Sequence, residues 1–319
     1  MIGVAVIGLG AIGRLHASNL ARHVPGARLA IVVDTLPGLA ERVAGELGAE
    51  WSTSPEAVLS RPDVSGVAIA APTPLHAELI ETAAAAGKHV FCEKPLGTGL
   101  EEVQRAVRAV RAAGLRLQVG FQRRFDPDFV AAKERLDGGA AGRIQLIRIA
   151  HRSRTPPHDG ELSERLGSIF VDMTVHDFDT ARWLVGEVAE VTAFQHARNT
   201  ITVLRFADGA LGLVDNSRHA GYGFDCSVEV VGSDCTLRIG ARGHAADVDQ
   251  LSTLGTLSHI AEDNIERHGS AYLEELRHFV ECVDGGREPC VAGEDAIAAL
   301  RLALRAEQSV RIAASASAS

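Results

Sequence analysis

The chain has 319 residues, a length that suggests about two domains, and 46% of its residues are hydrophobic and 23% are charged, as in ordinary globular proteins. The formal net charge is -9, and no long basic run is present. Nucleic acids and anionic membranes are bound by clustered Lys and Arg, so this composition argues against both as partners. We therefore expect a small-molecule ligand.

The cysteine pattern indicates reduced thiols. The five cysteines include no CxxC pair and no zinc-binding spacing, and their odd number excludes a complete disulfide framework. No basic stretch precedes the first apolar run, and no apolar run is long enough to cross a bilayer. We expect a cytoplasmic protein with neither a signal peptide nor a membrane span.

The first half of the chain alternates short apolar runs with Ala-, Leu- and Arg-rich stretches at helical spacing. An alternating order of strands and helices predicts a doubly wound parallel sheet, and strands without polar faces fit a sheet that is covered on both sides. We expect an α/β Rossmann domain over residues 1–121. Its predicted strands lie at 4–7, 29–33, 66–70, 89–92 and 115–120, and its predicted helices lie at 12–20, 36–47, 75–86 and 99–113.

A glycine motif, Gly8-Leu9-Gly10-Ala11-Ile12-Gly13, follows the first predicted strand and opens a helix. Gly8 permits a tight turn, Gly10 lets the backbone approach a pyrophosphate, and Gly13 lets the helix pack closely on the strand. The helix N-terminus, with Ala11 and Ile12, offers free N–H groups to phosphates. A glycine turn in an unrelated sheet is the alternative, but the strand before and the helix after favour a dinucleotide site.

Asp34 ends the second predicted strand, 21 residues after Gly13. A carboxylate there accepts hydrogen bonds from the adenosine ribose and repels a 2′-phosphate, and no arginine follows directly in Thr35-Leu36. The cofactor is therefore predicted to be NAD rather than NADP. Asp34 also fits a turn or a helix N-cap, and the two roles are compatible.

Two further motifs follow predicted strands. One contains Ala71, Thr73 and His76, and the other contains Glu93 and Lys94 before a proline. In a parallel sheet these strand ends lie on one edge with the glycine loop, where ligands of open α/β sheets bind. A lysine there is placed to touch whatever meets the nicotinamide, and a solvated surface lysine is the alternative.

The second half of the chain predicts an α+β domain with a mostly antiparallel sheet over residues 122–312. A strand at 143–151 and a loop with Pro156-Pro157 precede a helix at 169–185. Longer strands over 188–239 are joined by turns at Asp208-Gly209 and Gly232-Ser233-Asp234, and helices follow at 264–284 and 293–312. The Ala- and Ser-rich tail, 313–319, predicts disorder.

Asp172 and His176 are four residues apart on the predicted 169–185 helix, so they share one face. A carboxylate beside an imidazole orients the ring and raises its basicity, which suits a general base near neutral pH. An ordinary surface pair and a zinc site are the alternatives, although no third zinc ligand is evident from spacing and we expect no metal. Asp177 and Asp179 are interpreted as residues of the polar helix face.

These motifs together resemble the Gfo/Idh/MocA oxidoreductases over almost the whole chain. The resemblance rests on the glycine loop, on Glu93-Lys94-Pro95, on GFQRRFDP at 120–127 and on DMTVHDFD at 172–179. The last two segments are similar to those of inositol 2-dehydrogenases. The resemblance implies NAD-dependent oxidation of a secondary hydroxyl group of a cyclitol to a ketone.

The resemblance also implies a role for individual residues. Lys94 would contact the reacting hydroxyl and the nicotinamide side, His176 would take the hydroxyl proton, and Asp172 would orient the substrate or His176. Arg123 and His151 would line the substrate pocket. Tyr222 would also contact the substrate. The segment from Ala71 to His76, together with Glu93 and Gln122, would contact the cofactor.

Three other functions stay open on the sequence alone. They are the oxidation of another sugar or sugar derivative, cofactor sensing by a non-catalytic regulator, and hydrolysis that uses tightly bound NAD. The apolar strands at 201–206 and 211–214 predict an uncovered sheet face and hence a homo-oligomer, a dimer or a tetramer.

Overall fold

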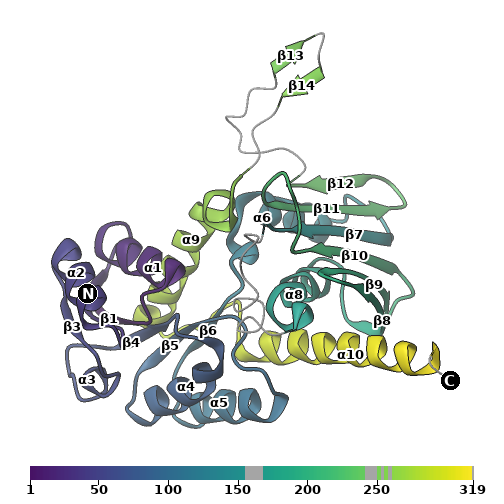
Figure 1. Cartoon of the computed structure of the whole chain (residues 1–319). Coiled ribbons are helices and arrows are strands. Elements are labelled where there is room, and N and C mark those ends of the chain that lie inside the picture. The colour runs from purple at the N-terminus through teal and green to yellow at the C-terminus, as the bar shows by residue number, and fades with distance from the viewer. Residues whose placement is uncertain (155–167, 241–249, 253–254, 258–260, 318–319) are drawn as a thin grey trace. The chain divides into compact units, whose positions relative to one another are not determined.

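The computed structural model describes residues 1–154, 168–240, 250–252, 255–257 and 261–317, which form two compact units (Figure 1). The first unit comprises Met1–Gln122 and Ser270–Leu300, and the second comprises Arg123–Gly269 and Arg301–Ser319. The sequence-based division instead assigned everything from 122 to 312 to one domain. The predicted loop at Pro156-Pro157 lies outside the described residues.

The first unit contains a six-stranded sheet in the order β3-β2-β1-β4-β5-β6, with parallel pairing throughout. The strand order reverses at β1 and β4, and ligands of doubly wound sheets bind at such a switch point. The predicted Rossmann fold is therefore confirmed. The strands are β1 (Ile2–Ile7), β2 (Ala27–Val33), β3 (Glu50–Ser52), β4 (Gly66–Ile69), β5 (His89–Glu93) and β6 (Leu117–Gly120).

Helices cover both faces of this sheet (Figure 1). The predicted helices are present as α1 (Ala11–Arg22), α2 (Pro37–Leu47), α4 (His76–Ala85) and α5 (Leu100–Ala112), and a short α3 (Glu56–Leu59) is added. Helices α1 and α2 share one apolar core with β1 and β2, to which Leu276, Phe279 and Val280 of α9 (Asn264–Gly285) contribute. Helices α4 and α5 pack against each other on the opposite face (Figure 1).

The second unit contains a six-stranded sheet in the order β12-β11-β7-β10-β9-β8. Among its described strands β7 and β10 pair in parallel and the other neighbours are antiparallel, which confirms the predicted mostly antiparallel sheet. Both predicted hairpin turns are present, between β9 and β10 and between β11 and β12. The strands are β7 (Ile144–Arg152), β8 (Val188–His196), β9 (Asn199–Phe206), β10 (Leu211–Ser217), β11 (Asp225–Gly232) and β12 (Thr236–Ile239), with a separate pair β13 (Gln250–Ser252) and β14 (Gly255–Leu257).

The helices of the second unit include α6 (Pro127–Asp137) and the predicted helix around residue 176, which consists of a π-helical turn (Phe170–Thr174) and α8 (Val175–Leu184). Helix α10 (Gly293–Ser317) contributes its second half, which reaches β8 through a hydrogen bond from Ala193 N to Ser309 Oγ of 2.8 Å. It continues through 313–317, where the sequence predicted a disordered tail. Among the described residues, no helix has both the length and the apolarity that a membrane span requires.

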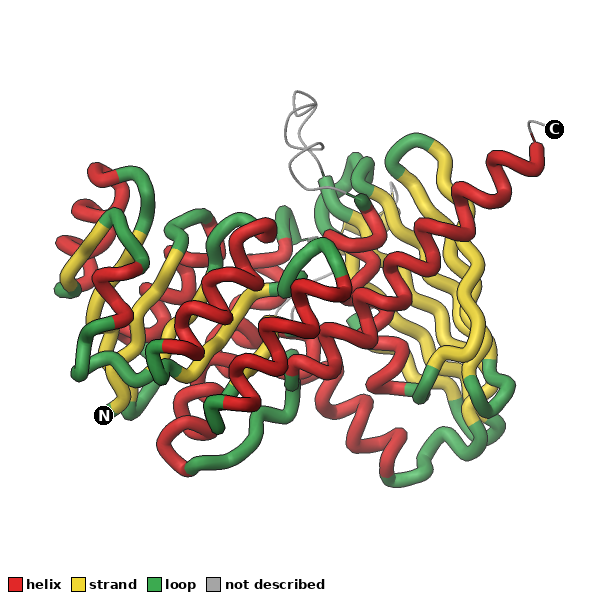
Figure 2. The backbone as a smooth tube through the Cα atoms, turned by 90° about the horizontal axis from the view of Figure 1, so that it is seen from below, coloured by secondary structure: helices red, strands yellow, loops and turns green. Residues whose placement is uncertain are grey.

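The sheet of the second unit has one buried and one exposed face. Along β9 the side chains alternate, so that Thr202 and Leu204 are buried whereas Ile201 and Val203 are exposed. Figure 2 shows helices of the described part of the chain on one side of these strands. The apolar residues on the other side are exposed, and within the described residues they form the open face that the sequence predicted.

Candidate functional site

The glycine loop joins β1 to α1 at the switch point of the first sheet. Gly8 has a φ of 91°, and a Cβ on Gly13 would lie 1.9 Å from the Gly8 carbonyl oxygen, so both positions require glycine. A Cβ on Gly10, by contrast, would meet nothing within 4 Å. Gly10 also caps α1 without a side-chain hydrogen bond, which leaves the first N–H groups of the helix, including those of Ala11 and Ile12, to a ligand. Open space above an uncapped helix N-terminus fits a dinucleotide diphosphate.

Asp34 ties the end of β2 to this loop. Its carboxylate accepts hydrogen bonds from the backbone N–H groups of Leu9, at 2.8 Å, and of Leu36, at 3.0 Å. The predicted turn role is therefore present. A carboxylate has about four acceptor sites, so these two bonds leave acceptor sites on Asp34 for the predicted contact with the ribose hydroxyl groups.

His76 connects the two other strand ends. Its Nδ1 lies 2.7 Å from the Pro95 carbonyl oxygen and its Nε2 lies 2.6 Å from the Ala71 carbonyl oxygen. Burial lowers the pKa of His76, and these two bonds oppose that shift. The ring thus ties the segment after β4, with Thr73 in its 3-10 turn, to the segment after β5.

Glu93 and Lys94 stand at the end of β5, and both are partly buried. His16 of α1 donates to Glu93 through Nε2 at 2.7 Å. Gln122, at the end of the first unit, is buried, and its Oε1 has no hydrogen-bond partner among the described residues. An orphaned buried acceptor fits the predicted contact of Gln122 with a ligand.

In the second unit, Asp172 lies in the π-helical turn and His176 lies in the first turn of α8. His176 is buried, and its ring packs edge-on against His151 of β7 with 6.1 Å between the ring centroids. Asp172 accepts a hydrogen bond of 2.6 Å from Arg218. Within the described residues, Asp172 and His176 belong to no group of three or more potential metal ligands. π-Helical turns occur frequently at functional sites.

Asp177 is the centre of a buried polar network, not a residue of the polar helix face as predicted. Arg123 Nη1 donates to its Oδ1 at 2.5 Å, and Asn216 Nδ2 donates to its Oδ2 at 2.7 Å. Burial by itself would raise the pKa of Asp177, but attraction to His151 and Arg123 outweighs burial and lowers the pKa to about 2. Arg123 Nη2 also lies 2.9 Å from His151 Nδ1. The network therefore holds the ring that packs against His176.

Asp179 is likewise buried, and the structure corrects the prediction made for it. Its carboxylate accepts two hydrogen bonds from Arg124, at 2.5 Å and 2.9 Å. The sequence held a signal for both pairs, because two adjacent arginines, 123 and 124, match two acids on one helix. No comparable signal marked Asn216 or Arg218, which the fold brings to Asp177 and Asp172 from 39 and 46 residues away.

Tyr222 lies apart from this buried network, with 48% of its surface exposed. Its hydroxyl group donates to Asp225 at 3.0 Å and accepts from Arg152 at 3.3 Å. Its predicted contact with the substrate stays a prediction.

Known proteins similar to this chain match both units. The Gfo/Idh/MocA model, described as an oxidoreductase family with an NAD-binding Rossmann fold, matches residues 2–121, and the model of the Gfo/Idh/MocA C-terminal domain matches residues 129–238. These matches confirm the predicted fold, the NAD cofactor and the oxidoreductase class.

Three proteins similar to this chain are named as inositol dehydrogenases. The scyllo-inositol 2-dehydrogenase (NAD(+)) of Bacillus subtilis is 40% identical over 96% of this chain and 93% of its own length. The myo-inositol 2-dehydrogenase of Thermotoga maritima is 36% identical over 96% of both chains. The crystal structure of Lactobacillus casei scyllo-inositol dehydrogenase with NAD(H) and scyllo-inositol has a TM-score of 0.92 at 27% identity and covers 98% of this chain and 97% of that one.

Proposed function

Because this chain belongs to the Gfo/Idh/MocA family of NAD-binding oxidoreductases, we propose that it oxidises a secondary hydroxyl group of an inositol to a ketone. The observation that carries the proposal is the similarity over nearly the full length to inositol 2-dehydrogenases, in which both units take part. Lys94, Asp172 and His176 supply the side chains that such a reaction needs.

Bound NAD supplies the hydride acceptor. The loop from Gly8 to Gly13 would hold the diphosphate at the N-terminus of α1, which carries no side-chain cap. Asp34 accepts hydrogen bonds from the backbone of Leu9 and Leu36, and it would also accept them from the hydroxyl groups of the adenosine ribose. Its negative charge disfavours the 2′-phosphate of NADP.

In the proposed reaction, His176 takes the proton of the reacting hydroxyl group as the hydride leaves the same carbon. The Lys94 ammonium contacts that hydroxyl and stabilises the charge that develops on its oxygen. Asp172, held by Arg218, orients the substrate or His176. His151 lines the pocket beside His176, while the buried Arg123 fixes His151 and Asp177.

We further propose a homo-oligomer, a dimer or a tetramer, that buries the apolar outer face of the second sheet. A hydrophobic patch of this kind on a soluble enzyme usually marks an interface. A cytoplasmic location is proposed on the basis of the cysteines, since Cys92, Cys226, Cys235, Cys282 and Cys290 are all free thiols.

The test is an assay of NAD reduction over inositol isomers and aldoses, repeated with NADP. We expect turnover with myo- or scyllo-inositol, weaker turnover with aldoses, and a preference for NAD over NADP. Tight NAD binding without turnover on any polyol would contradict the proposal and favour a cofactor-sensing regulator. Faster turnover of an aldose than of every inositol would instead favour a sugar dehydrogenase.

A further inference from the structure

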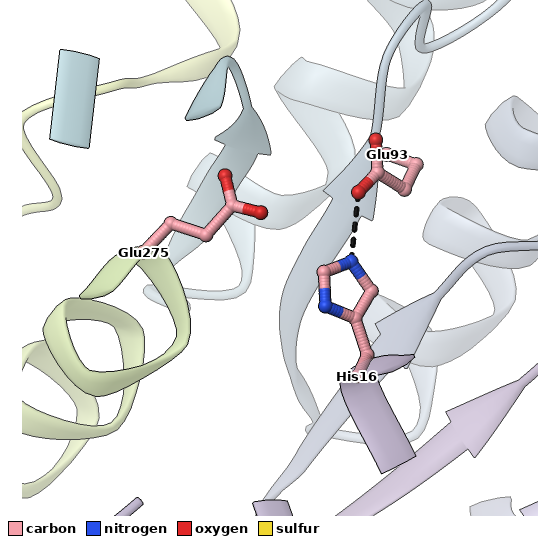
Figure 3. A group of neighbouring side chains, drawn as sticks. All are labelled: His16, Glu93 and Glu275. Carbon is pink, nitrogen blue, oxygen red and sulfur yellow. Dashed lines mark hydrogen bonds and ion pairs between the residues drawn. The ribbon is translucent and has the colours of Figure 1, made fainter. Parts of the chain in front are cut away.

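Three titratable side chains meet in the first unit, and one of them belongs to Glu93, the residue that precedes Lys94. They are His16 of α1, Glu93 at the end of β5 and Glu275 of α9 (Figure 3). One nitrogen or oxygen of each residue lies within 4.8 Å of the corresponding atoms of the other two. Figure 3 shows the Glu275 carboxyl group pointing toward the hydrogen-bonded pair of His16 and Glu93.

Glu93 is held from two sides. His16 donates to its Oε1 at 2.7 Å, and the His16 ring is itself packed edge-on against Phe91 and Tyr272. A Cβ on Gly120 of β6 would lie 2.9 to 3.1 Å from the Glu93 carboxyl group, so Glu93 fills the space that this glycine leaves. Because Lys94 is the next residue, the position of the Glu93 side chain bears directly on the backbone that carries Lys94.

Glu275 is fully buried, and neither carboxyl oxygen has a hydrogen-bond partner among the described residues. Its backbone is fixed, because Gln118 Nε2 donates to the Glu275 carbonyl oxygen at 2.6 Å. An ionised carboxylate without a partner is costly in a protein interior, and a second carboxylate nearby adds repulsion. Burial raises the pKa of Glu275, and repulsion from Glu93 raises it further.

We propose that Glu275 is a neutral carboxylic acid at the working pH and that it is a positioning residue for Glu93, and through Glu93 for Lys94. A neutral Glu275 leaves Glu93 as the single anion of the cluster, bonded to His16 and not repelled from the strand end. This inference rests on the proposed function, in which Lys94 contacts the reacting hydroxyl. A divalent cation could also neutralise the three side chains, but a bound proton does so without any further component.

The first experiment compares Glu275→Gln with Glu275→Leu in steady-state kinetics with NAD and inositol. Glutamine is neutral and nearly isosteric with the protonated acid, so we expect kcat within about threefold of the unsubstituted enzyme. Leucine removes the polar group that faces Glu93, so we expect kcat to fall by about tenfold to a hundredfold through the misplacement of Lys94. Glu274→Gln, at the half-exposed neighbouring position paired with Arg277, is the control and should leave kcat unchanged. Loss of activity in Glu275→Gln, or full activity in Glu275→Leu, would overturn the inference.

The second experiment measures unfolding of the unsubstituted protein and Glu275→Gln by denaturant between pH 5 and pH 8, and it needs no turnover. A carboxyl group whose folded-state pKa is raised contributes stability that is complete below its ordinary value of 4.5 and is lost as the pH rises. The unfolding constant of the unsubstituted protein, relative to the glutamine variant, should therefore rise by up to about tenfold per pH unit.

Parallel pH curves for the two proteins would show that Glu275 is ionised and would contradict the proposal. So would a stoichiometric metal, found by elemental analysis of the unsubstituted protein and missing from Glu275→Gln. If no polyol is oxidised, the proposed function fails while the unfolding curves still decide the protonation state of Glu275. If inositol is oxidised but the curves are parallel, this inference alone fails.

Discussion

Lys94 and His176 carry the proposed chemistry at the scale of single residues. Replacing either with alanine should lower kcat by about 10²- to 10⁴-fold, the usual contribution of a positioned acid or base. The KM for NAD should change little in His176→Ala, because His176 acts on the substrate proton. Steady-state NAD reduction with inositol measures both effects, and intrinsic fluorescence titration with NAD checks that the cofactor still binds.

The chain offers matched controls for both substitutions. Lys133→Ala is the control for Lys94→Ala, because Lys133 pairs with Asp137 on the surface of α6. His219→Ala is the control for His176→Ala, because His219 is exposed. Both control variants should keep full activity. Undiminished turnover in Lys94→Ala or in His176→Ala would remove that residue from the mechanism.

The residues that could be predicted from the sequence are those whose partners are close in the chain. The loop from Gly8 to Gly13 lies directly between a predicted strand and a predicted helix, and Asp34 follows Gly13 by 21 residues. Asp177 could not be assigned in this way, because its burial depends on Asn216, 39 residues away, and on Arg123, 54 residues away. A polar residue on a helix is predicted to be exposed unless its distant partner is known.

At the scale of elements, the apolar runs predicted the buried strands and helices of the first sheet. Strand β3 was missed because it has three residues, of which Glu50 and Trp51 are exposed, so it shows neither a run nor an alternation. Helix α6 was missed as well, although Asp126 and Pro127 form a typical helix start. The elements that were predicted are those whose buried side chains form an apolar run or a regular apolar spacing in the sequence.

The start of α6 is joined to α9 by a charged contact that makes stability depend on pH. Asp126, the N-cap of α6, accepts hydrogen bonds from Asp128 N, from Arg267 at 2.9 Å and from His268 Nδ1 at 2.8 Å. Burial lowers the pKa of His268 to about 4, although the bond to Asp126 opposes this shift. His268 Nε2 has no hydrogen-bond partner in the described part of the chain, which fits a neutral ring.

His268→Asn is the variant that tests this contact, because asparagine keeps a donor for Asp126 but does not titrate. In the unsubstituted protein the unfolded chain gains a proton below the ordinary pKa of 6.5, whereas the folded chain gains it only near 4. Stability is therefore complete above pH 6.5 and falls by about 3 kcal/mol as the pH drops to 4. Denaturant unfolding at several pH values should show this loss reduced in His268→Asn.

The exposed His219 provides the control for this measurement, and His219→Asn should retain the full acid loss. An acid loss of equal size in His268→Asn and in the unsubstituted protein would contradict the assignment. The remaining slope in His268→Asn belongs to the other groups whose pKa is lower in the folded chain, among them His76 and Asp177, the latter with a pKa of about 2.

At the scale of the whole molecule, the two units do not correspond to two continuous stretches of chain. Helices α9 and α10 each contribute residues to both units, since the divisions fall at Gly269 and at Leu300. Hydrophobic periodicity marks each helix as one element and carries no information about which core its successive turns join. This explains why the sequence predicted the change of architecture near residue 121 but not the return of residues 270–300 to the first unit.

The exposed face of the second sheet is the reason that we expect several copies of the chain to assemble. Phe194, Ile201, Val203 and Leu211 are exposed to 59%, 40%, 42% and 45%, and the register places Phe194 opposite Ile201 on neighbouring strands. Side chains of one parity on paired strands share a face, so these residues form one apolar patch. Ile201→Lys combined with Val203→Lys puts two charges into the patch, and charged residues are depleted in the core of interfaces.

We expect the unsubstituted protein to sediment as a dimer or tetramer at micromolar concentration and the double lysine variant to sediment as a smaller species. Denaturant unfolding at matched concentration separates loss of assembly from loss of folding. Trp51→Lys places one such charge on another exposed apolar residue, on strand β3 of the first unit, and should leave the assembly unchanged. A monomeric unsubstituted protein would exclude the proposed oligomer. Unchanged sedimentation of the double variant would exclude this face as the interface, because two buried unpaired ammonium groups are too costly to retain in a packed contact.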